Sequence, residues 1–69
     1  MDICDSQGRL AFKLETDTWY VEASYKGCKT KTHLALGETF TIELQGQVTS
    51  VTRIDNLHFK IQRSYSANI

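Results

Sequence analysis

Charge of one sign is what this sequence most clearly lacks. Eight lysine and arginine residues balance eight aspartate and glutamate residues, so the 69-residue chain has a formal net charge of zero at pH 7. A balanced chain produces no long-range field that would draw it to nucleic acid or to an anionic membrane. Any basic surface must therefore come from the local placement of a few cations.

Cysteines and long apolar runs are also scarce. Only Cys4 and Cys28 are present, whereas small secreted domains built on disulfides usually have about four or more closely spaced cysteines. We expect two reduced thiols, with a single Cys4–Cys28 bridge as the alternative. No signal-peptide pattern opens the chain, and no segment approaches the roughly 20 apolar residues that span a bilayer. We therefore expect a soluble cytoplasmic protein without a membrane partner.

The residue types used in catalysis and metal binding show no productive spacing. Cys4, Cys28, His33 and His58 are far apart in the sequence and form no Cys-x-x-Cys or similar ligand pair. The sequence contains no glycine-rich phosphate loop, nucleophile elbow or His-Glu-x-x-His motif. A chain of this size also has little surface from which to build a deep, water-excluding pocket. We predict that the protein is not an enzyme and uses no metal or cofactor.

What the sequence does contain is alternation of apolar and polar residues with period two, which predicts β-strands. The clearest case is residues 38–61, where Phe40, Ile42, Leu44, Gly46 and Val48 share one parity. The alternation breaks after Val48 and resumes at residues 57–61. It predicts two long strands, with Gly46 inside the first, a bend at 49–52 and a turn at 53–56.

Three earlier strands follow from the same alternation, over residues 9–15, 19–26 and 28–36. Trp19 shares parity with Val21 and is predicted to be the main core aromatic. The inward parity of the third strand includes Leu34 and Leu36. No window has the spacing of an amphipathic helix, so the predicted fold class is all-β.

Five strands in an open sheet would leave one face wet and two edges unpaired. We therefore predict a single small β domain over residues 1–69, folded as a five-stranded antiparallel barrel or a strongly bent meander of the SH3-like, Sm-like or OB-like kind. Residues 1–8 are polar and rich in turn-forming residues, and they are predicted to be a short lead-in or the tip of a turn. Residues 64–69 are predicted to be a frayed tail.

One segment resembles a known family. The run Leu44-Gln45-Gly46-Gln47-Val48, followed by Asp55, is similar to the bent second strand of Sm-like RNA-binding proteins. The resemblance covers less than half of the chain. No helix is predicted before the first strand and the second Sm signature has no counterpart, so the resemblance transfers no functional residue.

Basic residues gather on two of the predicted strands. Lys29, Lys31 and His33 project from one face at a repeat of roughly 6.6 to 7 Å, comparable to the phosphate spacing of a nucleic-acid strand. Lys60 and Arg63 lie on and after the last strand. The functional interpretation is a basic sheet face for single-stranded nucleic acid. The structural interpretation is a solvated face whose lysines discourage edge-to-edge aggregation.

Two tyrosines complete the candidate residues. Tyr20 follows the predicted core residue Trp19 and must point to the opposite side of its strand, where it could contact a partner. Tyr65 lies near the basic residues of the last strand. We expect a small non-catalytic binding module that docks onto another protein or onto a second copy of itself. Binding of single-stranded RNA or DNA through the basic residues is the alternative.

Overall fold

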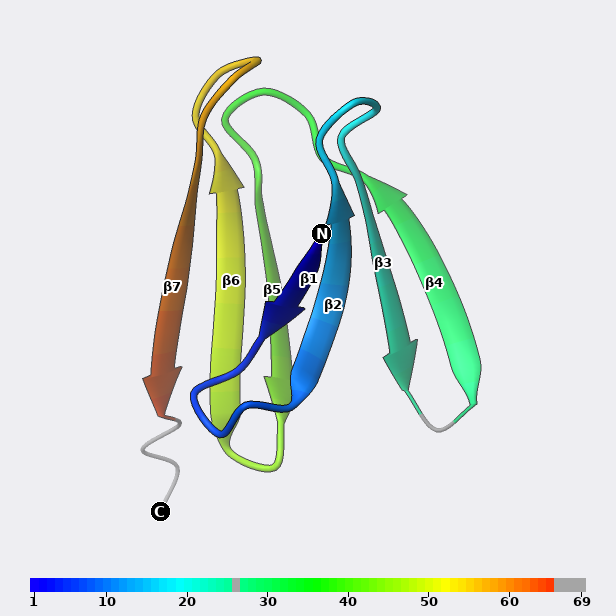
Figure 1. The fold of residues 1–69 in the computed structure, drawn as a ribbon, viewed down its shortest axis with the longest axis vertical. Helices are drawn as coiled ribbons and strands as arrows, with labels where there is room; N and C mark the ends of the chain where they lie inside the picture. Colours follow the sequence, from blue (N-terminus) through cyan, green and yellow to red (C-terminus); the bar gives the residue numbers. More distant parts are fainter. Residues whose placement is uncertain (26, 66–69) are drawn as a thin grey trace.

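The computed structural model describes residues 1–25 and 27–65, which form seven antiparallel strands in two sheets (Figure 1). The strands are β1 (Asp2–Cys4), β2 (Leu10–Glu15), β3 (Tyr20–Tyr25), β4 (Cys28–His33), β5 (Thr39–Leu44), β6 (Gln47–Arg53) and β7 (Phe59–Tyr65). The first sheet has the order β1-β2-β3-β4 and the second has the order β5-β6-β7. The all-β prediction is confirmed.

The two sheets form one hydrophobic core between them. Its fully buried members include Phe12, Leu14 and Val21 from the first sheet and Val51 from the second. Phe40 of the second sheet adds an edge-on contact to Phe12, with ring centroids 5.4 Å apart. Across the described residues no strand ladder joins the two sheets. The closed barrel, one of the two predicted alternatives, is therefore wrong, and the described strands number seven and not five. Each sheet is instead a separate meander.

The predicted long strand over residues 38–49 is in fact a hairpin. Gln45 and Gly46 both have positive φ angles, 51° and 83°, and form the turn between β5 and β6. Positive φ at both central residues is what a two-residue hairpin turn of type I′ requires. Gly46 therefore lies in a turn and not inside a strand. The predicted bend at residues 49–52 is absent, because β6 continues without interruption through these residues.

This turn also reverses the predicted inward face of β6. Leu44 pairs with Gln47 across the hairpin, so the two side chains lie on the same side of the sheet. The next inward-facing residue after Leu44 is therefore Gln47, three positions later, and not Gly46, two positions later. Thr49 and Val51 become fully buried and Val48 points away, although the alternation of the sequence had placed Val48 inside.

Trp19 is buried as predicted, with 5% of its surface exposed, but it does not belong to a strand. It is the last residue of the turn between β2 and β3, and its φ is 57°. The ring packs edge-on against Phe59, with centroids 6.2 Å apart, and the Arg53 guanidinium lies 4.6 Å from the ring centroid. Arg53 also donates a hydrogen bond of 2.9 Å to the Leu34 carbonyl. This cluster joins the two sheets at one end.

Several strands and turns begin or end at residues other than those predicted. Residues Asp2–Cys4, predicted as part of the lead-in, form β1. The third predicted strand ends at His33, which leaves Leu36 exposed in the following turn. A turn does join the last two strands, but it spans residues 54–58 and exposes Leu57.

The chain end is also more ordered than predicted. Ser64 and Tyr65, assigned to the frayed tail, are the last residues of β7, and residues 66–69 lie outside the described part. Nowhere in residues 1–25 and 27–65 is there a helix with the length and apolarity to cross a membrane.

The left-handed backbone of Trp19 gives a test of the turn and the core together. Trp19→Ala should lower the free energy of unfolding by about 3–5 kcal/mol, because it removes a core aromatic. Trp19→Gly removes the same ring but should cost less than Trp19→Ala, since a left-handed conformation costs a non-glycine residue about 1–2 kcal/mol. Urea unfolding of the two variants measures both differences. An alanine variant as stable as the parent would contradict the core position, and a glycine variant less stable than the alanine variant would contradict the turn conformation.

The buried hydroxyl of Thr49 gives a second test. Thr49 Oγ1 is buried and has no hydrogen-bond partner among the described residues. Thr49→Val keeps the shape and removes this unpaired group, so it should raise the free energy of unfolding by about 1 kcal/mol. Thermal melting should then rise by roughly 4–8 °C. Thr41→Val, on the exposed face of β5, is the matched control and should change the melting temperature little.

Candidate binding surfaces at the edge strand and at the polar end

The first candidate surface is β4. It is the last strand of the first sheet and all six of its residues are exposed. Only β3 pairs with it, through the register from Tyr20 opposite His33 to Tyr25 opposite Cys28. Figure 1 shows β4 on the far side of the molecule from β7. One long edge of β4 is therefore unpaired within the described residues.

The pairing with β3 determines which backbone groups face this free edge. The Leu34 amide donates a hydrogen bond of 2.7 Å to the Trp19 carbonyl, which makes this a hydrogen-bonded pair. Antiparallel pairs alternate between hydrogen-bonded and non-hydrogen-bonded types, so even-numbered residues of β4 direct their N–H and C=O groups to β3. The residues that direct these groups to the free edge are Lys29, Lys31 and His33.

The side chains of these three residues lie on the outer face of the first sheet. The Lys31 ammonium is 5.1 Å from the centroid of the Tyr20 ring, and the His33 ring packs edge-on at 5.2 Å from the same ring. The structure thus brings Tyr20, predicted as a protein contact, together with predicted cations. We name Tyr20, Lys29, Lys31 and His33 the basic edge. Glu22 lies opposite Lys31 in the register, so this face is not uniformly positive.

The other two predicted cations do not join the basic edge. Lys60 and Arg63 belong to β7 in the second sheet and point to opposite faces of that strand. Lys60 is paired with Thr52 on the outer face, whereas Arg63 is paired with the buried residue Thr49. Arg63 Nε donates a hydrogen bond of 2.7 Å to the carbonyl of Cys4. The five basic residues predicted as one interface therefore lie on three separate surfaces.

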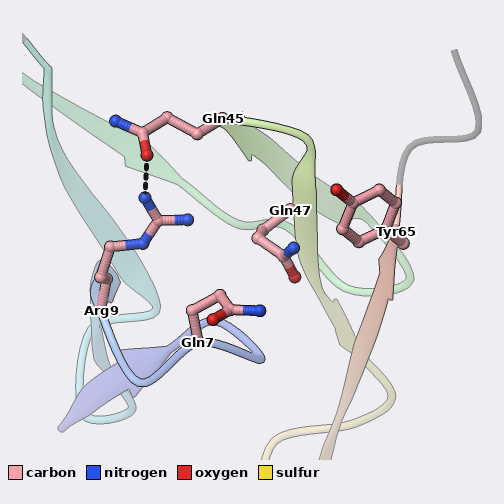
Figure 2. Close-up of a pocket in the computed structure, with 5 residues that line it drawn as sticks. All are labelled: Gln7, Arg9, Gln45, Gln47 and Tyr65. Atoms are coloured by element: carbon pink, nitrogen blue, oxygen red, sulfur yellow. Dashed lines mark hydrogen bonds between the residues drawn. The ribbon is translucent and has the colours of Figure 1, made fainter. Parts of the chain in front are cut away.

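The second candidate surface is a polar pocket of about 430 Å³ at the opposite end from Trp19. It lies between the β1–β2 loop, the β5–β6 turn and the end of β7 (Figure 2). Its lining residues are Gln7, Arg9, Gln45, Gln47 and Tyr65, and we name it the amide pocket. Sequence reasoning had selected only Tyr65. Gln7 and Arg9 come from the β1–β2 loop, Gln45 from the β5–β6 turn and Gln47 from the start of β6, and the four carry no local motif.

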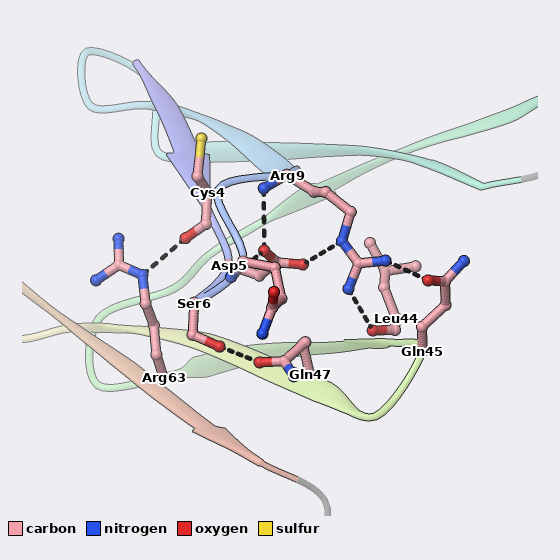
Figure 3. A network of polar contacts seen from close by, with 9 residues as sticks. Cys4, Asp5, Ser6, Arg9, Leu44, Gln45, Gln47 and Arg63 are labelled. Carbon is pink, nitrogen blue, oxygen red and sulfur yellow. Dashed lines mark hydrogen bonds and ion pairs between the residues drawn. The ribbon is translucent and has the colours of Figure 1, made fainter.

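Asp5 organises the β1–β2 loop on one side of this pocket (Figure 3). Its buried carboxylate accepts hydrogen bonds from the backbone amides of Gln7 (2.8 Å) and Arg9 (3.0 Å). It also forms an ion pair with Arg9 Nε, at 3.2 Å. Burial acts to raise the pKa of Asp5, but these amides and the guanidinium outweigh it and hold the pKa below its ordinary value. The loop is thus built around a charged carboxylate.

The same loop is tied to the β5–β6 hairpin. The Arg9 guanidinium donates hydrogen bonds to the side-chain oxygen of Gln45 and, at 3.4 Å, to the carbonyl of Leu44. The Ser6 hydroxyl donates to the side-chain oxygen of Gln47. Both contacts cross from the first sheet to the second, as Figure 3 shows. The pocket is therefore held between two elements that are bonded to each other.

The cysteines and histidines are dispersed in the fold. Cys4 is half-buried on β1 and Cys28 is exposed on β4, at the two ends of the first sheet. Three strand spacings of about 4.8 Å separate these strands by roughly 14 Å, which is too far for a disulfide. Within the described ranges, no three His, Cys, Asp or Glu residues lie close enough together to hold a metal ion.

Comparison of the chain with protein-family models, with curated proteins and with solved structures finds no match. The functional argument therefore depends on the geometry of the basic edge and of the amide pocket.

The lowered pKa of Asp5 predicts acid sensitivity. A carboxylate whose pKa is lower in the folded state stabilises the fold above its unfolded pKa, and this contribution is lost as the pH falls through the folded value. Asp5→Asn should therefore lower the melting temperature at pH 7, and the difference from the parent should shrink below about pH 4. Thermal melts at both pH values measure this. A difference that did not depend on pH would show that the charge of Asp5 does not stabilise the loop.

Proposed function

We propose that the protein is a small non-catalytic binding module that takes up an extended segment of another protein along the free edge of β4. The observation that carries the proposal is the combination of an unpaired edge, six exposed residues and outward-facing backbone groups at three consecutive odd positions. Addition of a strand to such an edge satisfies these backbone groups and is a common mode of peptide recognition.

The side chains of β4 define the chemistry of the segment. On the outer face, Lys29 and Lys31 favour acidic residues at alternate positions of the added strand. On the inner side, Thr30 and Thr32 are paired with the buried residues Ala23 and Val21 but remain exposed themselves. An added strand with β-branched residues at the intervening positions would extend this apolar layer. The expected partner is an extended segment that alternates acidic and β-branched residues.

A second copy of the chain is a poorer occupant of the same edge. Antiparallel pairing of two β4 strands around Lys31 would place Lys31 opposite its own copy. Like charges directly opposite each other destabilise a strand pair. The lysines thus support binding of a different, acidic partner and oppose self-association through β4.

Binding of single-stranded nucleic acid has weaker support. A phosphate chain requires several cations along one continuous path, whereas Lys60 and Arg63 lie on other surfaces and Glu22 is opposite Lys31. The Tyr20 ring already has two partners, because the Lys31 ammonium lies over it and the His33 ring packs edge-on against it. These contacts favour an acidic protein segment as the partner.

A peptide of alternating glutamate and valine tests the proposal. Titrated into ¹⁵N-labelled protein, it should give saturable shifts that are largest for the amides of Lys29, Lys31 and His33, because their N–H groups face the added strand. Its affinity should fall with added salt, since exposed ion pairs are screened. A peptide of alternating lysine and valine is the matched control and should not bind. Equal binding of both peptides, or shifts centred elsewhere, would contradict the proposal.

Two variants separate charge from backbone pairing. Lys31→Glu should weaken binding of the acidic peptide about tenfold, a loss of roughly 1.4 kcal/mol, whereas Lys60→Glu makes the same charge change in the other sheet and should have little effect. Lys31→Pro removes an outward N–H at a position where proline is tolerated in an edge strand. It should abolish binding while the protein stays folded. If it bound like the parent, strand addition at β4 would be excluded.

A further inference from the structure

We propose that the amide pocket is a binding site for a neutral, hydroxyl-rich ligand, namely a saccharide. The pocket lies at the opposite end of the molecule from the Trp19 cluster and shares no residue with the basic edge, so this proposal stands independently of peptide binding at β4. Its volume of about 430 Å³ falls within the range of roughly 300–1,000 Å³ that is typical of ligand sites.

The polar groups of the lining match hydroxyls better than any other ligand group. Gln7, Gln45 and Gln47 each present a carboxamide, which has both donors and an acceptor. The Gln45 and Gln47 oxygens accept hydrogen bonds from Arg9 and Ser6, so these two residues offer their NH₂ donors to a ligand. Gln7 has no side-chain hydrogen bond among the described residues and offers both kinds of group. A sugar hydroxyl both donates and accepts and can therefore pair with either.

The charge of the pocket disfavours an anion. Among the described residues, Arg9 is the one charged residue in the lining, and its guanidinium forms an ion pair with Asp5. The remaining guanidinium nitrogens donate to Gln45 and to the Leu44 carbonyl. A carboxylate or phosphate ligand would have to displace these bonds and would meet the negative charge of Asp5. The lining residues that the structure describes include no aliphatic side chain, which disfavours an apolar ligand as well.

Tyr65 supplies an aromatic surface at the rim. Its side chain is 71% exposed, and its ring lies beside Gly46, where a Cβ would be 3.9 Å from the nearest ring carbon. Tyr65 and Gln47 both line the pocket, and Figure 2 shows the two side chains on neighbouring strands at one side of it. Tyrosine combines an apolar ring with a polar hydroxyl. This combination suits a sugar ring, which has an apolar C–H face edged by hydroxyls.

The test is a titration of ¹⁵N-labelled protein with a panel of neutral oligosaccharides: maltotriose, cellotriose and triacetylchitotriose. At least one should give saturable shifts in the side-chain NH₂ signals of Gln7, Gln45 and Gln47. Tyr65→Ala and Gln7→Ala change exposed residues and should leave the fold intact while weakening that binding about tenfold or more. Gln62→Ala is the matched control, because Gln62 is an exposed glutamine on the outer face of β7, and it should bind like the parent.

The same titration contains the outcomes that would overturn the proposal. These are no saturable shift with any of the three sugars, or saturable shifts that persist in both Tyr65→Ala and Gln7→Ala. Inorganic phosphate and adenosine are run beside the sugars. If either shifted the pocket signals while all three sugars did not, the site would be an anion or nucleobase site and the assignment to a saccharide would be wrong.

Discussion

The two-residue turn at Gln45 and Gly46 is the constraint on which most of the second sheet depends. Because both residues are left-handed, the chain reverses in the shortest possible way and β6 begins directly opposite the end of β5. That start places Gln47, Thr49 and Val51 on the inner side. A turn longer by one residue would reverse every side chain of β6 and move Val51 out of the core. The same turn brings Gln45 and Gln47 to the rim of the amide pocket.

An arginine joins the two sheets at each end of the molecule. At the polar end Arg9 extends from the first sheet to the β5–β6 turn, and at the aromatic end Arg53 extends from the second sheet to the carbonyl of Leu34. Each guanidinium is also held by a second partner, Asp5 in one case and the Trp19 ring in the other. A chain this short buries only a modest apolar surface. The two arginine clusters add polar and cation–aromatic contacts between sheets whose shared core is small.

Much of the fold follows from local patterns, and the differences have identifiable physical causes. The alternation around Phe12 and Leu14 predicts β2 correctly, because one face of that strand is covered by the second sheet. It fails at Gly46, because a glycine in an apolar-alternating run is compatible with both a strand and a turn, and only the partner strand decides. The alternation also fails at Thr49. This residue is polar but fully buried, because it pairs with Ile42 across the sheet.

The sequence pattern predicted most of the basic edge but little of the amide pocket, because it does not contain how the two sheets pack. Lys29, Lys31 and His33 lie within one strand, so their common face can be read from the sequence by period two. Placing Lys60 and Arg63 with them required knowledge of how the sheets pack, which the sequence pattern does not contain. The amide pocket was predicted least, because its residues come from segments far apart in the sequence. These segments meet only in the folded chain, through contacts such as those of Arg9 with Gln45 and Leu44.

The free edge of β4 has a consequence for how such a module can diverge. Its six residues are all exposed, so substitutions there alter neither the packed residues between the sheets nor the arginine clusters at the two ends. Under the proposed strand addition at β4, mutations that exchange one partner for another would change no residue of the core. Paralogous copies of the domain would be free to acquire new recognition sequences on an unchanged scaffold.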